Sequence, residues 1–301
     1  MTDQPTPLAP NPSEQACPNC GAMLLGDWCH ACGQKKLKPE QQTIRWLVGQ
    51  FVDKLTSMDG KLPRSMGALA FQPGRLGLDW LEGRRARWAS PFALFLVVNL
   101  LYFLSPPVTD FHLPLVEQLF GQPYSGWAME RVDARLPGVE TWVDNNGISS
   151  PPTGYRELEE SFNLRSEGLS KTLLILHVPL LALMLLLLHS KRGLHYVDHF
   201  VIALHYWTFL LLALMVFPRF SMLCTRMLIA WDLISTPDTG QTFWKLGLLG
   251  LAILYLAVLL KRVYGQSWLI SFVKAGPAFL ACGLAHFAFR AVLFALTLSL
   301  I

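Results

Sequence analysis

The sequence predicts a mainly α-helical, polytopic membrane protein with about five transmembrane helices and a small zinc ribbon at its N-terminus. Of its 301 residues, 52% are hydrophobic and only 15% are charged, and the mean hydropathy is +0.35. Soluble domains carry about 25% charged residues, whereas a bilayer allows apolar side chains to face their surroundings. Four of the six cysteines lie within residues 17–32, which is typical of a metal site rather than of scattered core thiols.

The first residues predict a tail without fixed structure. Residues 1–16 carry four prolines and no apolar run, so they lack the core of a cleavable signal peptide. Such a composition cannot bury enough surface to become ordered. The first segment able to enter a membrane begins near Ala89, and we expect it to act as an uncleaved signal-anchor.

Residues 17–34 read CPNCGAMLLGDWCHACGQ and predict the zinc ribbon. Two Cys-x-x-Cys pairs can supply four thiolates to one structural zinc ion, and zinc binding would provide folding energy on the order of 10 kcal/mol. Gly21 and Gly33 each follow a pair, where a tight backbone turn favours glycine. A disulfide pair or a redox Cys-x-x-Cys is the alternative. The predicted ligands are Cys17, Cys20, Cys29 and Cys32.

Residues 35–88 predict amphipathic helices on the cytoplasmic face of the membrane. Residues 41–58 carry one apolar stripe at helical spacing, and residues 62–83 form a second region broken by Pro73 and Gly74. These segments are too short and too charged to span, so we expect them to lie along the membrane surface. A small soluble helical pair is the alternative.

Residues 89–301 predict the transmembrane domain. A helix of about 20 residues crosses a hydrocarbon core of about 30 Å. Residues 219–234 contain three charges and predict a surface helix, with a sixth span as the alternative. Residues 106–171 predict an acidic extracytoplasmic loop, and its Pro-Pro pairs favour a disordered connector over a folded lid. The predicted spans are about 89–105, 172–189, 197–217, 242–260 and 272–300.

Charge asymmetry orients these spans with the N-terminus inside and the C-terminus outside. The predicted inside segments hold 16 Lys and Arg against 9 Asp and Glu, whereas the outside segments hold 8 against 12. Cytoplasmic connections carry an excess of basic residues in membrane proteins. Both short inside connections are basic, with Lys191-Arg192 in one and Lys261-Arg262 in the other.

Several motifs occur in an order that resembles a known family. They are the two Cys-x-x-Cys-Gly knuckles, LEGRRARWASPF at 81–92, YVDHFVIALHYWTFLLL at 196–212 and KRVYGQSW at 261–268. This pattern resembles an uncharacterised bacterial family of zinc-ribbon membrane proteins, a domain of unknown function. The resemblance spans most of residues 17–275 without the acidic loop. It implies this architecture and a bacterial cytoplasmic (inner) membrane, and it implies no activity.

A cluster of basic and aromatic residues precedes the first predicted span. Basic residues beside an anionic leaflet each contribute about 1 kcal/mol, and tryptophan is enriched at the interface. The cluster therefore predicts a topogenic signal in contact with lipid, and specific recognition of lipid head groups is the alternative. Its members are Trp80, Arg84, Arg85, Arg87 and Trp88.

A second polar group surrounds the start of the third predicted span. His195 and His199 are four residues apart on one helix face with Asp198 between them, and His205 lies roughly 9 Å deeper. Helix rise also predicts that the other histidines are spread over the depth of the membrane, with His177 and His286 in different layers. A structural hydrogen-bonded cluster is therefore favoured over a catalytic metal site.

The sequence favours a non-enzymatic scaffold or regulatory protein, whose zinc ribbon docks a cytoplasmic protein partner. A small transporter or lipid-handling protein is the alternative, and a metal-dependent membrane enzyme is a third. Phosphate loops, dinucleotide fingerprints and paired catalytic carboxylates are missing from the sequence. The lipid bilayer is an expected partner, homodimer formation stays open, and the basic residues follow the membrane rather than a nucleic-acid-binding face.

The predicted topology has a direct test in fusions to a reporter that is active only outside the cytoplasm. A fusion after Leu300 should be active, and a fusion after Gly193 should be silent, because the basic connections hold the inside ends. A silent fusion after Leu300 would overturn the five-span topology and make residues 219–234 a span.

Overall fold

The computed structural model describes residues 16–24, 26–36, 60–105, 111, 113–144, 151–231 and 237–301, with only the backbone of residues 144 and 237–244. No strand occurs among them, only the isolated β-bridges of Ala16 with Met23 and of Trp28 with Lys35. The predicted tail, apart from Ala16, and the predicted helix at 41–58 lie outside the described residues. The helices are α2 (Lys61–Phe71), α3 (Arg75–Leu81), α4 (Pro91–Leu104), α5 (Leu115–Leu119), α6 (Ser125–Asp133), α7 (Val139–Asp144), α8 (Tyr155–Leu173), η3 (Leu174–Leu176), α9 (His177–Leu188), η4 (Ser190–Arg192), α10 (Tyr196–Ala230), α11 (Pro237–Tyr264) and α12 (Trp268–Ser299).

Four helical segments in the described part of the chain are long and apolar enough to cross a membrane. They are Tyr155–Leu188, Tyr196–Ala230, Lys245–Tyr264 and Trp268–Ser299. The first predicted span, 89–105, is the exception, because α4 has only 14 residues. At 1.5 Å per residue it measures about 21 Å, which is shorter than a hydrocarbon core of about 30 Å. The length of α4 therefore corrects the count of five full-length spans.

Helix α10 is the centre of the helical assembly. It packs against α9, α4 and α11, and its first half is buried on every side, with Val201, Ile202 and Leu204 fully inaccessible. The helix continues through Pro218 to Ala230 without a break. The prediction of a separate surface helix at 219–234 is therefore wrong as far as Ala230. In apolar surroundings a backbone remains helical across proline, because leaving the helix would strand further polar groups.

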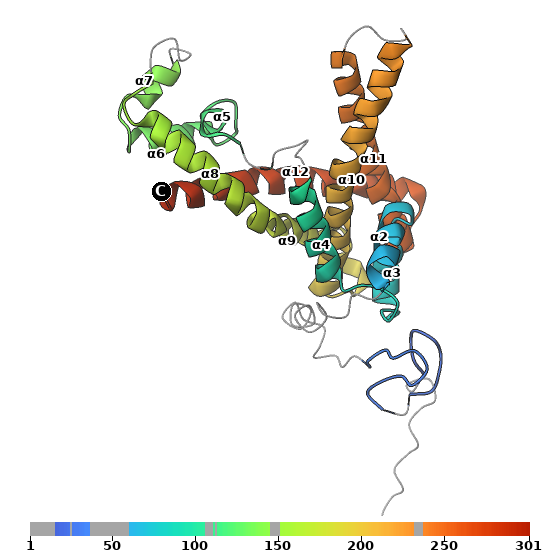
Figure 1. Cartoon of the computed structure of the whole chain (residues 1–301). Coiled ribbons are helices and arrows are strands. Elements are labelled where there is room, and N and C mark those ends of the chain that lie inside the picture. The colour runs from blue at the N-terminus through green and yellow to red at the C-terminus, as the bar shows by residue number, and fades with distance from the viewer. Residues whose placement is uncertain are drawn as a thin grey trace, which may run out of the picture.

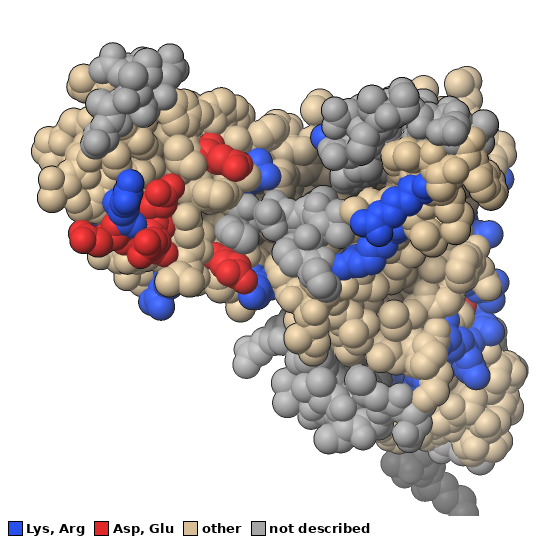
Figure 2. All heavy atoms as spheres, turned by 45° about the horizontal axis from the view of Figure 1, so that its top comes forward, with Lys and Arg blue, Asp and Glu red and all other residues tan. Residues whose placement is uncertain are grey.

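The acidic segment after α4 is largely helical, which corrects the prediction of a disordered connector. Helices α5 to α8, here called the α5–α8 unit, enclose a small core that includes Leu115, Val132 and Phe162, all fully buried. Figure 2 shows acidic side chains gathered on this part of the molecule. Helix α8 continues through η3 into α9, so the last helix of the unit is part of a candidate span. The Asn99 amide of α4 donates to the Lys171 carbonyl of α8 at 3.1 Å and so joins the two helices.

Helix α12 belongs to two hydrophobic cores. Its first two-thirds contribute Ala275, Cys282 and Phe289 to the main core around α10. Its last turns contribute Phe294 and Leu298 to the core of the α5–α8 unit. In Figure 1, α12 runs across the paired α10 and α11 and ends beside the α5–α8 unit. One continuous helix therefore links both cores.

The predicted break at Pro73-Gly74 is confirmed, and it docks the α2–α3 pair onto α11. Tyr255 donates from its hydroxyl to the Leu69 carbonyl at 2.7 Å, and Arg262 donates to the Pro73 carbonyl at 2.9 Å. Gly74 has φ of 77°, and a Cβ added there would lie 3.1 Å from both the Cα and the carbonyl oxygen of Leu259. The turn therefore requires glycine for its conformation and for the close approach of α11.

We expect Gly74→Ala to destabilise the protein. The left-handed backbone alone costs an L-residue about 1–2 kcal/mol, and contact with the Leu259 backbone adds to this cost. Gly67→Ala is the matched control, because Gly67 lies inside α2 with no atom within 4 Å of an added Cβ. That change should stabilise by about 0.5–1 kcal/mol. Thermal unfolding followed by circular dichroism in one detergent measures both, and equal melting midpoints would contradict the role of Gly74.

Candidate metal centre and the arginine loop beneath it

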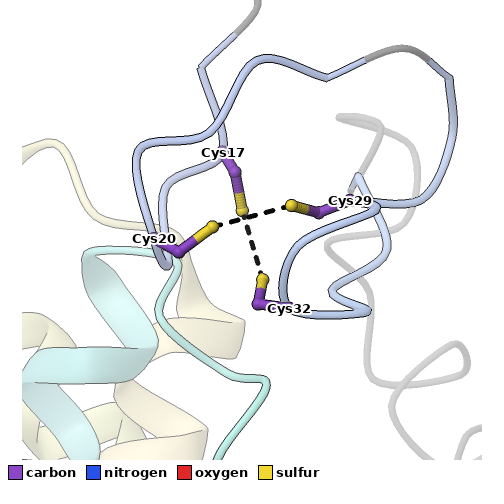
Figure 3. A group of neighbouring side chains, drawn as sticks. All are labelled: Cys17, Cys20, Cys29 and Cys32. Carbon is purple, nitrogen blue, oxygen red and sulfur yellow. Dashed lines mark hydrogen bonds between the residues drawn. The ribbon is translucent and has the colours of Figure 1, made fainter.

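Four cysteine side chains converge at the N-terminal end of the described chain. Their sulfur atoms all lie within 4.8 Å of one another, with 3.6 Å between Cys17 and Cys32 and between Cys20 and Cys29 (Figure 3). All four thiols are free. Tetrahedral coordination with metal–sulfur bonds of about 2.3 Å places sulfur atoms about 3.8 Å apart, so the cluster fits one metal ion. Within the described residues, no other group of three or more His, Cys, Asp or Glu side chains gathers in this way.

Two similar knuckles hold the cysteines in place. In each, the N–H of the glycine donates to the carbonyl of the first cysteine at 2.8 Å, as Gly21 does to Cys17 and Gly33 to Cys29. Both glycines have positive φ, 76° and 70°, which confirms the reason for glycine after each pair. The backbone therefore presents each pair of thiols from a similar turn.

The described residues 16–36, here called the cysteine module, rest on the connection between α3 and α4. This connection, residues 82–90, is called the arginine loop. The buried Gln34 side chain donates to the Gly83 carbonyl and accepts from the backbone N–H groups of Arg85 and Ala86, both at 3.0 Å. Pro18 covers Gly83 so closely that a Cβ there would lie 3.2 Å from the Pro18 Cβ. Gln34 thus adds to the internal bond of the turn, in which the Arg85 N–H also donates to the Gly83 carbonyl at 3.1 Å.

The carboxylate of Asp79 organises the arginine loop. Its side chain is inaccessible to solvent and accepts from Arg84 at 2.7 Å, from Arg75 at 3.1 Å and from the Trp88 indole at 2.8 Å. Arg87 approaches the same carboxylate at 3.6 Å, and Arg84 also pairs with Glu82. A buried carboxylate is stable only when charge partners and hydrogen bonds surround it. Asp79 therefore fixes the directions of three arginines and one tryptophan.

The predicted interface residues meet in this one place. Trp80 is buried, its indole donates to Asp198 at 3.3 Å, and the Arg85 guanidinium stacks 3.6 Å above its ring. Burial lowers the pKa of Arg85 to about 10, and Asp198 opposes that shift, so Arg85 keeps its charge at neutral pH. Trp80 is therefore a packing residue within the protein, whereas lipid contact by the half-buried Arg84, Arg87 and Trp88 remains a prediction.

The residues of the polar cluster predicted at the start of α10 have different structural roles. His195 is the exposed N-cap of α10, and its backbone N–H donates to Asp198 at 3.0 Å in a capping box. His199 is buried and shares a 2.7 Å hydrogen bond with the Tyr264 hydroxyl. His205 is buried further along the helix, without a partner for its Nδ1 among the described residues. These side chains do not converge on one centre.

The prediction that His177 and His286 lie at different depths in the membrane is wrong. His177 on α9 and His286 on α12 lie together, with 3.3 Å between His177 Nε2 and His286 Nδ1. Helices that cross obliquely bring residues of different nominal depth into contact, which a rise per residue cannot anticipate. Arg290, one turn beyond His286, donates to Gln122 at 3.4 Å and so contacts the α5–α8 unit.

Sequence reasoning did not single out Asp79 or Gln34. A signal for Asp79 was present, because it lies four residues after Arg75 on one helix face and just before the arginine cluster. The role of Gln34 had no local signal, because its partners are 49 to 52 residues away in the chain. His189, which stacks on Tyr264 with ring centroids 3.6 Å apart, likewise depends on a long-range contact.

We expect Asp79→Asn to lower stability by about 3 kcal/mol, because it removes the only negative charge buried among the described arginines of the loop. Glu82→Gln is the control. It removes one partner of the same Arg84 from a position 40% exposed, where an ion pair is worth about 1 kcal/mol or less. Thermal melting in detergent should show a much larger shift for Asp79→Asn, and equal shifts would refute the organising role of Asp79.

Comparison with known proteins supports part of the expected resemblance. Residues 59–103 match a family described as "Protein of unknown function (DUF3667)". The match covers α2, α3, the arginine loop and nearly all of α4, and it is shorter than the stretch 17–275 over which the resemblance was expected. Neither a curated protein nor a solved structure matches the chain. The chain is thus similar to DUF3667 proteins over the part that holds Asp79 and the arginine loop.

Proposed function

We propose that this chain is a non-enzymatic membrane scaffold or regulatory protein, whose cysteine module binds a structural zinc ion and docks a cytoplasmic protein partner. One observation carries the proposal. The module is attached to the membrane helices through Gln34 on one side, while Trp28 and Met23 remain 61% and 56% exposed. A small attached module with large exposed apolar side chains is suited to binding a protein.

Zinc is the metal that the ligand set favours. Four thiolates in a tetrahedral arrangement suit zinc, and a shell closed by four protein ligands leaves no position for a reacting water. The module has few buried apolar side chains, so binding of the metal would supply its folding energy. Its role would therefore be to shape a recognition surface rather than to catalyse a reaction.

Orientation and location belong to the same proposal. Four candidate spans support residence in a membrane. The basic connections and the arginine loop favour a cytoplasmic N-terminus, and the resemblance to bacterial proteins favours a bacterial cytoplasmic membrane. The thiols of the module would then face a reducing compartment, in which metal binding is favoured over disulfides.

A small transporter or lipid-handling protein is the second candidate. A cavity of about 280 Å³ lies between α6 and the end of α12. Its walls are mostly apolar, but Arg131 and Arg135 also line it, so an amphiphile with an anionic group would suit it. The metal-dependent enzyme is less favoured, because the metal-ligating side chains that gather within the described residues are all cysteines.

Metal analysis and photo-crosslinking in intact membranes test the proposal together. The wild type should carry one zinc per chain, and Cys29→Ser should lose it while membrane levels stay normal, because insertion depends on apolar length. A photoreactive residue in place of Met23 should form a partner adduct that disappears in Cys29→Ser and in Trp28→Ala. His30→Ala, an exposed change in the same module, should keep both the zinc and the adduct.

The two parts of the proposal can fail separately. Stoichiometric zinc in a Cys17→Ser, Cys29→Ser double variant would overturn the metal assignment. An adduct that survives in zinc-free Cys29→Ser would refute the docking role and leave the metal site standing. Retention of the adduct in Trp28→Ala would exclude Trp28 as the contact.

A further inference from the structure

A second, smaller cavity lies beneath the arginine loop. It measures about 40 Å³ and is lined by α3, the loop, the start of α4 and His205 of α10. A single water needs about 10–15 Å³ on this measure, so the cavity accepts a group of several atoms. The loop residues over it are only half-buried, which leaves access from the side of the loop.

Three buried polar atoms in its wall lack hydrogen-bond partners among the described residues. They are the Arg85 Nε, the Ser90 Oγ and the His205 Nδ1. His205 is only 5% exposed, so little of its ring reaches bulk solvent. Most buried polar groups in native proteins form hydrogen bonds, so three such groups around one cavity favour a polar ligand there.

The start of α4 adds further donors. Ser90 occupies the N-cap position, but its side chain makes no capping hydrogen bond. The first intrahelical bond runs from the Leu94 N–H to the Ser90 carbonyl, so the N–H groups of Phe92 and Ala93 have no acceptor within the helix. A helix N-terminus with free N–H groups favours an anion.

The charges around the cavity are positive in sum. Asp79 forms ion pairs with Arg75, Arg84 and Arg87, and Arg84 also pairs with Glu82. Arg85 forms no ion pair with a described residue, and Asp198 attracts it only at longer range. Arg85, which lines the cavity, therefore has charge available for a ligand.

We propose that this cavity binds a phosphate group, which Arg85, Ser90, His205 and the N-terminus of α4 would hold together. Tetrahedral phosphate oxygens accept several hydrogen bonds at once, which suits guanidinium and backbone donors that converge from different elements. The group could belong to a phospholipid head group or to free phosphate. This site is independent of the docking role proposed for the cysteine module.

The test uses the full-length, metal-loaded protein in nanodiscs. In phosphatidylcholine nanodiscs, inorganic phosphate is titrated and the melting midpoint is followed. In a second arm, the nanodiscs contain increasing fractions of phosphatidylglycerol in place of phosphatidylcholine. The protein is then transferred to detergent, and mass spectrometry measures how much phosphatidylglycerol each chain retains. We expect saturable binding of one anion per chain in one of these arms. Saturation by phosphate identifies a soluble ligand, and saturation by phosphatidylglycerol alone identifies a head group.

Two matched pairs of variants test whether the anion binds in this cavity. Arg85→Gln should weaken binding about tenfold, whereas Arg87→Gln, which removes the same charge from the same loop outside the cavity, should leave it within about twofold. His205→Leu should also weaken binding about tenfold, and His205→Gln, which keeps an N–H donor, should retain most of it. Metal content and the melting midpoint without anion show whether each variant is folded. The two His205 variants change no residue of the Asp79–arginine network, so they test the cavity separately from that network.

The proposal is overturned if neither anion binds the wild type saturably, which would mean that water alone fills the cavity. It is also overturned if Arg85→Gln and Arg87→Gln lose binding equally, because the effect would then be general attraction to the loop. Equal binding by His205→Leu and His205→Gln would remove His205 from the site and overturn the assignment of the cavity.

Discussion

The buried carboxylate of Asp79 is the constraint on which the structure around the arginine loop depends. A buried carboxylate without partners would strongly destabilise the fold. Here Arg75, Arg84 and Arg87 surround the carboxylate, and the Trp88 indole donates a hydrogen bond to it. Once these side chains are fixed, the course of the arginine loop is fixed as well. The loop in turn determines where α4 begins and which surface the cysteine module meets.

This arrangement connects the candidate metal centre to the membrane helices by a short series of contacts. The knuckles position Gln34, Gln34 holds the arginine loop, and the loop is attached through Asp79 to α3. Helix α3 then contacts α10 through Trp80 and Asp198. A change in the module would therefore also affect the arginine loop, because the Gln34 side chain supplies hydrogen bonds to the loop backbone.

The parts of this structure that depend on local chemistry were predictable from the sequence. The knuckle glycines, the break at Pro73-Gly74 and the apolar helices follow from backbone conformation and hydropathy. The parts that depend on distant partners were not. Trp80 meets Asp198 from 118 residues away, and His177 meets His286 from 109 residues away. The α5–α8 unit was missed because its short amphipathic helices find their core only when packed together and against α12.

The passage of α12 through both hydrophobic cores has a mechanical consequence. Lys274 near its start donates to the Leu188 carbonyl at 2.7 Å, and Phe294 near its end is buried in the α5–α8 unit. Pro277 lies inside α12 between these two contacts, and proline is a position at which a long helix bends. The α5–α8 unit and the end of α9 are therefore connected through a single helix, and Pro277 is the position at which that connection can change its angle.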